Sequence, residues 1–218
     1  DADHQRVRAA EHGDQELFTR AELVAHFSLE NVGKAAGIFN PEKLQWVNFQ
    51  YLKATPLATL TEMVVPFLER AGLPVPDDRA WLARAVATLQ ERAKTLVELA
   101  EFCRFYLLDP IEPDPKAAAK HLTPAIAPAL DALVGRLSAL ATWTPQSIEG
   151  AFQETLATHA LRLGALAQPV RVAVTGGTVS PGIYEVLDVL GPARTLARLR
   201  AAGARLAVPA VPAAAADS

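Results

Sequence analysis

The sequence predicts an all-α protein made of consecutive small helical bundles. Nearly every segment of the 218-residue chain places apolar residues at helical spacing behind a recognisable N-terminal cap. No stretch of useful length alternates apolar and polar residues as a half-buried β-strand does. Half of the residues are hydrophobic, which is enough to fill real cores in one large domain or in two or three small ones. The chain is therefore expected to fold as helices packed on helices.

The first two helices are predicted from their caps. Thr19 and Glu22 have the three-residue spacing of a capping box, which predicts a short helix through residue 27. Asn40 before Pro41 is an N-cap followed by proline at the first helical position. The apolar residues behind it recur at helical spacing and predict the second helix: Leu44, Val47, Tyr51 and Leu52.

Three further helices are expected before residue 110. Thr55-Pro56 repeats the cap-and-proline pattern and predicts a helix that Gly72 ends. A proline-rich turn then leads to Asp77 and a long helix. The expected helices run over about 56–71, 77–92 and 95–106.

Residues 109–115 contain three prolines and predict a linker, because proline disfavours helix in the residue before it. Beyond the linker, 116–140 is expected to be helical, with Pro124 and Pro128 delaying its start or kinking it. Thr144-Pro145 and Ser180-Pro181 predict two more helix starts. The low-complexity tail, residues 208–218, is expected to be disordered.

Composition excludes several kinds of protein. The single cysteine, Cys103, rules out an intramolecular disulfide framework and a cysteine-based zinc site. No apolar run approaches the ~20 residues that span a bilayer, and the charged first residues are unlike a signal peptide, so a cytoplasmic location is expected. The net charge of −3 argues against non-specific coating of a polyanion. Specific contact with an RNA loop stays open, because such loops are read by base edges and stacking as much as by charge.

No catalytic constellation is recognisable. The five histidines are far apart, with none paired at helical spacing as metal ligands. The segment 175–178 (Thr-Gly-Gly-Thr) lacks the lysine of a phosphate loop and is typical of a helix end. Cys103 lies among aromatic residues and is interpreted as a buried structural thiol. The chain taken alone is expected to be non-catalytic and to hold no metal or cofactor.

Five groups of residues, in chain order, resemble the C-terminal half of bacterial-type, class I glutamyl-tRNA synthetases. The resemblance extends from about residue 11 to about residue 206, and the order of the five groups makes it specific. The segments are Glu11–Phe18 (EHGDQELF), Phe27–Val32 (FSLENV), Phe39–Asn48 with Tyr51–Lys53, Glu91–Leu99 (ERAKTLVEL), and Gln168–Gly176 (QPVRVAVTG) with Ser180–Gly191. Residues 1–10 depart from the family.

The resemblance implies a non-catalytic, anticodon-binding role. The family's two class I catalytic signatures, of the His-Ile-Gly-His and Lys-Met-Ser-Lys-Ser types, do not occur in this sequence. The parent enzyme, glutamate–tRNA ligase, attaches glutamate to its tRNA with ATP and Mg²⁺. Residues 1–56 are expected to end the stem-contact region, with helical anticodon-binding subdomains at 57–110 and 111–207. The expected partner is glutamate tRNA, with neither DNA nor a membrane, and the expected state is monomeric.

The resemblance also implies individual RNA contacts. Arg92 matches the family's arginine that reads the third anticodon base, where a guanidinium fork can make two bonds to a base edge. Arg171 matches a position in the last subdomain. Ser180, Pro181 and Ile183 match the segment that lies against the first two anticodon bases, where a helix start offers free N–H groups and apolar surface.

The residues themselves allow simpler interpretations. Arg92 also fits a surface arginine paired with a neighbouring glutamate, and Ser180-Pro181 fits an ordinary helix cap. Lys43 and Trp46 share one helix face and suit a phosphate contact and a stacked base, or equally a solvated lysine and a core tryptophan. The other two tryptophans, Trp81 and Trp143, are expected to be packing residues.

Two alternative functions remain open at this point. One is a helical protein-interaction scaffold without an RNA role, which the acidic net charge favours. The other is a non-discriminating synthetase that also charges glutamine tRNA, although an arginine at position 92 favours the discriminating type.

Overall fold

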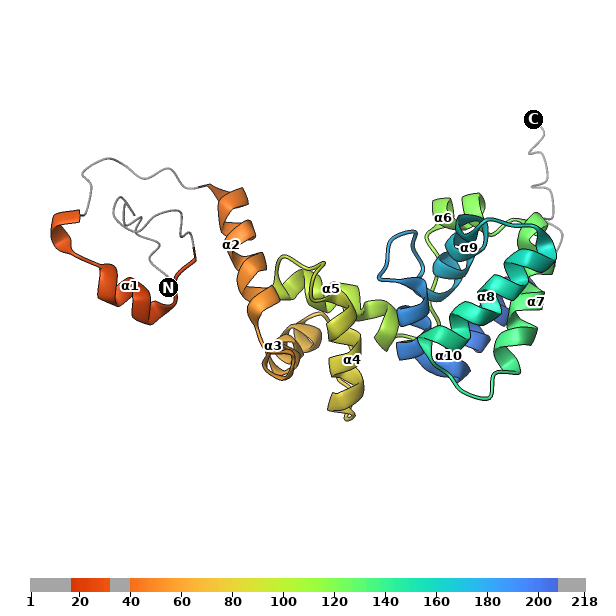
Figure 1. Cartoon of the computed structure of the whole chain (residues 1–218), viewed down its shortest axis with the longest axis horizontal. Coiled ribbons are helices and arrows are strands. Elements are labelled where there is room, and N and C mark those ends of the chain that lie inside the picture. Colours follow the sequence, from red (N-terminus) through yellow and green to blue (C-terminus); the bar gives the residue numbers. More distant parts are fainter. Residues whose placement is uncertain (1–16, 32–39, 208–218) are drawn as a thin grey trace, which may run out of the picture.

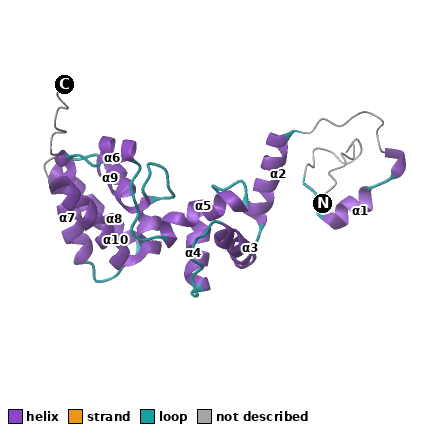
Figure 2. Ribbon diagram, turned by 180° about the vertical axis from the view of Figure 1, so that it is seen from behind, coloured by secondary structure: helices purple, strands orange, loops and turns teal. Residues whose placement is uncertain are grey.

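The computed structural model describes residues 17–31 and 40–207 of the chain. These residues form ten α-helices and two short 3₁₀ helices, and no β-strand occurs within them (Figures 1 and 2). The all-α prediction is therefore confirmed. None of the helices in these two ranges combines the length and the apolar character needed to cross a bilayer. The predicted tail at 208–218 and the divergent residues 1–10 lie outside the described residues.

The helices form three consecutive groups along the long axis of the molecule (Figure 1). The first group is α1 (Arg20–His26). The second contains α2 (Pro41–Ala54), α3 (Leu57–Arg70), α4 (Arg79–Leu89) and α5 (Leu96–Leu107). The third group contains α6 (Pro115–His121), α7 (Ala127–Ser138), α8 (Pro145–His159), α9 (Leu163–Thr175) and α10 (Ile183–Ala207). Helices α3 to α5 pack on one another, α10 packs against α7, α8 and α9, and α10 also meets α4.

Most of the predicted helix starts are confirmed. Thr19 forms the expected capping box, Asn40 Oδ1 accepts from two backbone N–H groups of α2, and Thr95 caps α5. Thr144 and Ser147 form a second capping box at the start of α8. Side chains at these positions satisfy N–H groups that have no partner inside the helix.

Two of the caps predicted before residue 110 are wrong. Thr55 does not start α3, since its Oγ1 donates back to Tyr51 O at 2.7 Å and so completes the end of α2. The cap of α4 is Asp78, which accepts from Trp81 N at 2.9 Å, one residue after the predicted start at Asp77. The helix then ends at Leu89 rather than near residue 92.

The long helix predicted over 116–140 is also wrong. The chain instead forms α6, a 3₁₀ turn at Pro124–Ile126 and then α7. Pro124 opens the 3₁₀ turn and Pro128 lies in the first turn of α7, where a missing N–H costs nothing. The two prolines therefore delay the start of α7, which is one of the two predicted effects, and do not kink a longer helix.

A single buried cluster of apolar side chains extends from Leu52 on α2 to Ala202 on α10. Leu60 and Val64 fill the part under α3 to α5, while Leu133 and Phe152 fill the part under α7 to α10; none of the four is exposed to solvent. Because the cluster is continuous, the helices on the two sides of the 108–114 linker share one core.

Helix α10 is interrupted at Gly191, whose backbone is non-helical (φ 77°, ψ 169°). The next residue, Pro192, has no N–H to offer to a preceding carbonyl. Two tryptophan side chains donate to carbonyls before the break. Nε1 of Trp143, in the loop between α7 and α8, donates to Leu187 O at 3.0 Å, and Nε1 of Trp81 on α4 donates to Val189 O at 2.8 Å. Both tryptophans are partly buried and pack against the core, as predicted, and their indole N–H groups also bond the backbone before the break.

Candidate nucleic-acid interface

Arg92 lies in the turn between α4 and α5, and its side chain is exposed. The turn is held firmly. The backbone N–H groups of Arg92 and of Ala93, which is buried, both donate to Leu89 O at 2.9 and 3.3 Å. On the far side of the turn, the backbone N–H of Lys94 donates to the Glu98 carboxylate at 2.7 Å. Arg92 thus projects from a fixed backbone.

The same turn is tied to α2. Gln90 Nε2 donates to the carbonyl oxygens of Leu52 and Thr55, both at 2.9 Å, and the Asn48 amide donates to Lys94 O. The two Gln90 bonds bind carbonyls at the C-terminal end of α2, where the helix offers few N–H partners. They also fix where Arg92 lies with respect to α2.

Arg171 belongs to α9 and is partly buried. Its Nε donates to Ser180 Oγ at 2.8 Å, and that hydroxyl donates in turn to Pro181 O at 2.9 Å. Ser180 is therefore occupied with Arg171 and Pro181 and does not cap α10, which begins at Ile183. The predicted cap is wrong, and the hydroxyl orients a guanidinium instead.

The structure brings Arg92 and Arg171 within electrostatic reach of each other, although 79 positions separate them in the chain. Burial lowers the pKa of the Arg171 guanidinium, and the positive charge of Arg92 lowers that pKa further. Among the described residues, neither guanidinium forms an ion pair with a carboxylate. Two positive charges within electrostatic reach and without a carboxylate partner favour a ligand that is rich in hydrogen-bond acceptors.

The loop between α9 and α10 carries Ser180 beside this pair. Gly176 ends α9 with φ +82°, and a Cβ there would lie 3.0 Å from Glu112 O. Asp114 N donates to Gly176 O at 2.7 Å, so the loop is held against the linker. Only glycine allows this close approach with a positive φ. The expected helix end at 175–178 is confirmed.

Pro181 and Ile183 do not contribute apolar surface in this conformation, because both are buried. Val179, which the sequence analysis did not select, is 81% exposed in the same loop. A valine between a threonine and a serine carries no sequence signal of exposure, so only the fold identifies it. The apolar contact expected from this segment is therefore available from Val179.

Lys43 and Trp46 lie on α2 and are not part of the arginine pair. Lys43 Nζ lies 4.7 Å from the centroid of the Trp46 ring, and 38% of Trp46 is exposed. The tryptophan is therefore not a core residue, and its ring is partly accessible. The pair forms a second, separate polar and aromatic surface on the helix next to the Arg92 turn.

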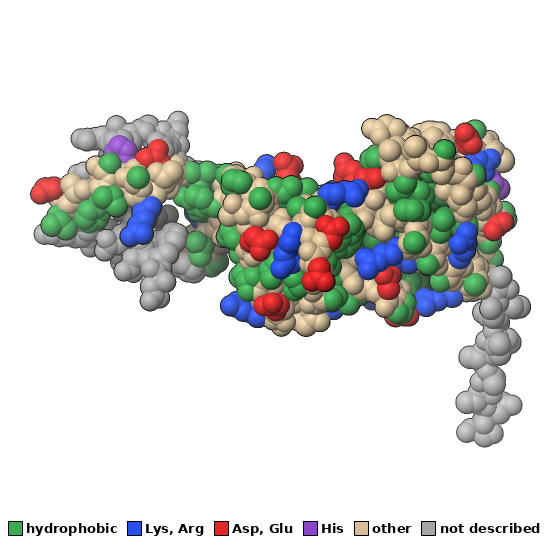
Figure 3. Space-filling view, turned by 90° about the horizontal axis from the view of Figure 1, so that it is seen from below, with side chains coloured by type: hydrophobic (Ala, Val, Ile, Leu, Met, Phe, Trp, Pro, Cys, Tyr) green, Lys and Arg blue, Asp and Glu red, His purple; other side chains and the backbone are tan. Residues whose placement is uncertain are grey.

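The space-filling view shows positive and negative side chains interspersed over the visible face, with no single basic patch (Figure 3). No group of three or more metal-ligating side chains occurs in the part of the chain that the structure describes. Cys103 is fully buried, as predicted, and burial raises its thiol pKa to about 12. The arrangement suits recognition of polar groups by a few placed side chains.

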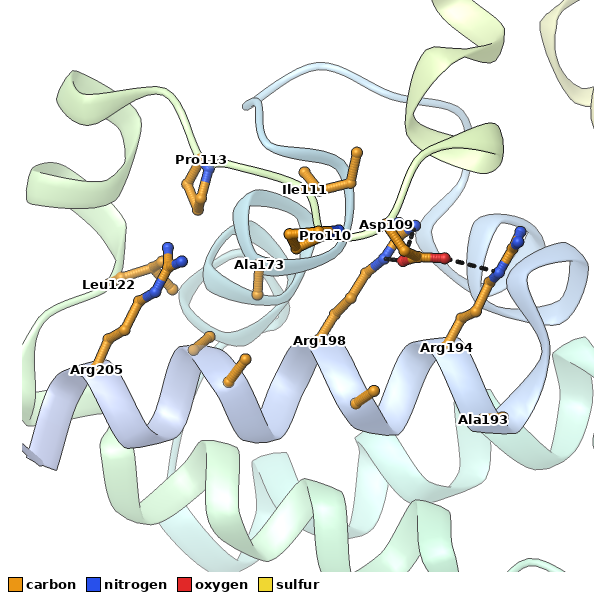
Figure 4. Close-up of a pocket in the computed structure, with 13 residues that line it drawn as sticks. Asp109, Pro110, Ile111, Pro113, Leu122, Ala173, Ala193, Arg194, Arg198 and Arg205 are labelled. Carbon is orange, nitrogen blue, oxygen red and sulfur yellow. Dashed lines mark hydrogen bonds and ion pairs between the residues drawn. The ribbon is translucent and has the colours of Figure 1, made fainter. Parts of the chain in front are cut away.

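A cavity of about 480 Å³ lies between the 109–113 linker and the second part of α10 (Figure 4). Its walls are mainly apolar. The side chains of three arginines extend from α10 toward the linker side of the cavity: Arg194, Arg198 and Arg205. Sequence reasoning selected none of them. Their partners lie up to 93 positions away in the chain, and such separations leave no local pattern.

Comparison with known proteins gives consistent results. Residues 59–203 match the family model described as "Anticodon binding domain". The chain is 50% identical over 188 residues to the glutamate–tRNA ligase of Syntrophobacter fumaroxidans, covering 86% of this chain and 40% of that protein. It is 47% identical over 192 residues to the glutamate–tRNA ligase of Thermodesulfovibrio yellowstonii, covering 87% of this chain and 41% of that protein. The chain thus spans about 40% of the length of these relatives.

Solved structures show the same fold. A crystal structure of a glutamate tRNA ligase from Elizabethkingia meningosepticum, in complex with its amino acid, superimposes with a TM-score of 0.79 at 23% identity. The superposition covers 88% of this chain and 38% of that one. A glutamate–tRNA synthetase from Elizabethkingia anophelis gives a TM-score of 0.73 at 22% identity, covering 86% and 36%.

Proposed function

This chain belongs to the anticodon binding domain family, and from that premise we propose that it reads the anticodon of glutamate tRNA as the C-terminal part of a glutamate–tRNA ligase. The observation that carries the proposal is that the guanidinium groups of Arg92 and Arg171, from the α4–α5 turn and from α9, lie within electrostatic reach of each other and neither is paired with a carboxylate. The ligase as a whole would couple ATP with Mg²⁺ to the attachment of glutamate, through residues outside this chain.

The two arginines take different parts in the proposed reading. Arg92 is exposed, and its planar fork can donate two bonds to the edge of the third anticodon base. Arg171 is partly buried and oriented by Ser180, which suits an acceptor held near the first two bases. Val179 offers the exposed apolar surface against which an unstacked base can lie.

Lys43 and Trp46 supply a second contact in this proposal. A partly exposed indole is a stacking platform for a base, and a lysine next to it suits a phosphate. Both residues lie on α2, which is bonded to the Arg92 turn through Gln90. An RNA loop bound at Arg92 would therefore extend its backbone toward a rigidly connected helix.

The test is to measure, by fluorescence anisotropy at moderate salt, how tightly anticodon stem-loops bind to this chain. A glutamate stem-loop is expected to bind more tightly than one with a scrambled anticodon loop. Arg171→Ala should weaken the glutamate complex. Arg162→Ala removes the same charge at the opposite end of α9 and serves as the matched control. Equal affinities for the glutamate and scrambled loops would contradict RNA reading and favour an interaction scaffold.

A further inference from the structure

One side chain bridges helices on both sides of the linker. Arg198 of α10 is only 6% exposed, and all five of its N–H groups have acceptors. Nε and Nη2 donate to Asp109 Oδ1 at 3.0 and 2.7 Å, and Nη2 also donates to Leu108 O at 2.7 Å. Nη1 donates to Phe105 O of α5 at 2.8 Å and to Val174 O of α9.

Asp109 is shared with a second arginine, Arg194 (Figure 4). Arg194 Nε lies 2.9 Å from Asp109 Oδ2, and its Nη1 donates to Tyr106 O at 2.7 Å. The Arg194 guanidinium also lies 5.5 Å from the centroid of the Trp81 ring on α4. The three charged residues, Asp109, Arg194 and Arg198, are called the Asp109 clamp below.

The clamp joins the two elements that carry the reading arginines. Arg92 lies in the turn that leads into α5, and α5 ends in the carbonyls that Arg198 and Arg194 bind. Arg171 lies one turn before Val174 on α9, whose carbonyl also binds Arg198. A change in the angle between α5 and α9 would therefore break clamp bonds and move Arg92 relative to Arg171 at the same time.

Burying the charged Arg198 side chain in the Asp109 clamp has a desolvation cost. Burial lowers the pKa of Arg198, and the bonds to Asp109 offset that effect. The Arg198 side chain is buried, whereas the Asp109 side chain is 42% exposed. An ion pair with a buried partner often adds little stability compared with apolar packing, but it demands a particular geometry. The five directional bonds of Arg198 specify one arrangement of α5, the linker and α9. Helix packing alone tolerates small rotations.

We propose that Arg198 and Asp109 are positioning residues that set the spacing between Arg92 and Arg171, and thereby the selectivity for the third anticodon base. The inference rests on the proposed anticodon-reading function. A bidentate contact needs its donors placed within about 0.5 Å, whereas phosphate attraction tolerates larger errors. Loosening the clamp should therefore reduce selectivity more than total affinity.

The experiment compares two stem-loops that differ only at the third anticodon base, cytosine as in glutamate tRNA and guanine as in glutamine tRNA. The variants are Arg198→Lys, which keeps the charge but not the fork, and Asp109→Asn, which keeps the shape but not the charge. Arg194→Gln is milder because the Arg194 side chain is 40% exposed. Arg205→Gln, on the same helix and paired with Glu112 at an exposed surface, is the matched control.

The ratio of the two affinities is expected to fall about fivefold or more in Arg198→Lys and Asp109→Asn, because typical coupling between two sites is of that size. The ratio should fall less in Arg194→Gln. It should not change in Arg205→Gln. Each variant is first shown to be folded by circular dichroism. An unchanged ratio in folded clamp variants overturns the inference. A wild-type chain with no preference between the two loops contradicts the proposed function itself.

An RNA-free measurement separates positioning from general stability. Spin labels at Val97→Cys on α5 and Gln153→Cys on α8 report the distance between the second and third helical groups. Cys103 is buried and stays unlabelled. The distance distribution should broaden in Arg198→Lys and keep its width in Arg205→Gln. A distribution as narrow as that of the wild type would overturn the positioning role, even if Arg198→Lys unfolds at a lower temperature.

Discussion

At the scale of single residues, the two arginines of the proposed reading site differ in how much freedom they keep. Arg92 has a fixed backbone and a free, exposed side chain, so it can orient its fork on a base edge. Arg171 is already oriented by its bond to Ser180 and loses less conformational entropy when it binds. Their mutual repulsion is relieved when an acceptor lies between them. Selectivity is therefore expected to depend on Arg92, and affinity on both.

Arg92→Ala should relax selectivity at the third anticodon base by about 1–3 kcal/mol, because a bidentate contact to a base edge has that value. The measurement is the ratio of affinities for the cytosine and guanine stem-loops. Lys94→Ala, two residues away and also exposed, is the control and should weaken both complexes equally if it contacts only phosphate. A wild-type chain that binds both loops equally would instead support a non-discriminating synthetase.

Cys103 is predicted to be unreactive in the folded protein. Its thiol is fully buried with a pKa of about 12, while an exposed thiol ionises near pH 8.5. A disulfide exchange reagent at pH 8 should therefore find almost no thiolate in the native chain, and one thiol per chain after denaturation. In Val97→Cys, at a position that is 60% exposed, one thiol should react at once. Rapid native reaction at Cys103 would contradict the assigned burial.

The residues of the proposed site differ in how far the sequence could point to them. Arg92 and Arg171 were selected through family resemblance, and their approach depends on how α5 and α9 pack. The burial of Pro181 and Ile183 is likewise a tertiary effect, since proline and isoleucine occur on surfaces and in cores. Arg198 was missed because its acceptors are mostly backbone carbonyls, which every residue has.

At the scale of elements, cap-and-proline patterns located helix starts well where no partner outside the helix start bonded the side chain. Asn40 and Thr144 both cap as predicted. Thr55 and Ser180 have the same pattern, yet their hydroxyls bond to a carbonyl and to Arg171. A hydroxyl can donate as well as accept, so a serine or threonine before proline can either cap the next helix or bond another group. The sequence pattern does not distinguish these two outcomes.

Gly191→Ala should destabilise the protein by about 1–3 kcal/mol, because φ 77° with ψ 169° is a conformation that is essentially restricted to glycine. A Cβ at Gly191 would meet no atom within 4 Å, so the cost comes from the backbone rather than from a clash. The measurement is the free energy of unfolding in urea. The matched control is Gly203→Ala in the regular part of α10, where alanine also meets nothing and should stabilise by about 0.5–1 kcal/mol. Two variants of equal stability would contradict the strained break.

At the scale of the whole molecule, a continuous core makes the helical groups mechanically dependent on one another. Buried side chains extend without interruption from α2 to α10, and the break in α10 is satisfied by Trp81 of α4 and Trp143. Periodicity predicted that the chain is helical and roughly where each helix lies. It did not predict which helices meet, because an apolar helix face is complementary to many others. Residues 108–114 form the non-helical connection between α5 and α6, and one core extends on both sides of it.

The overall charge gives the last prediction, which concerns salt. With a net charge of −3 and interspersed charges on the surface, the chain offers few cations to phosphates, and about three contacts are expected. For single-stranded RNA this gives a log–log slope of about −2, so a rise from 50 to 200 mM salt should weaken the glutamate complex by about 20-fold. A protein that binds six to ten phosphates loses about 10³–10⁵ over the same range. Affinity of the stem-loop measured across a salt series distinguishes the two. A steep slope would mean that bulk attraction, and not a few placed side chains, holds the RNA.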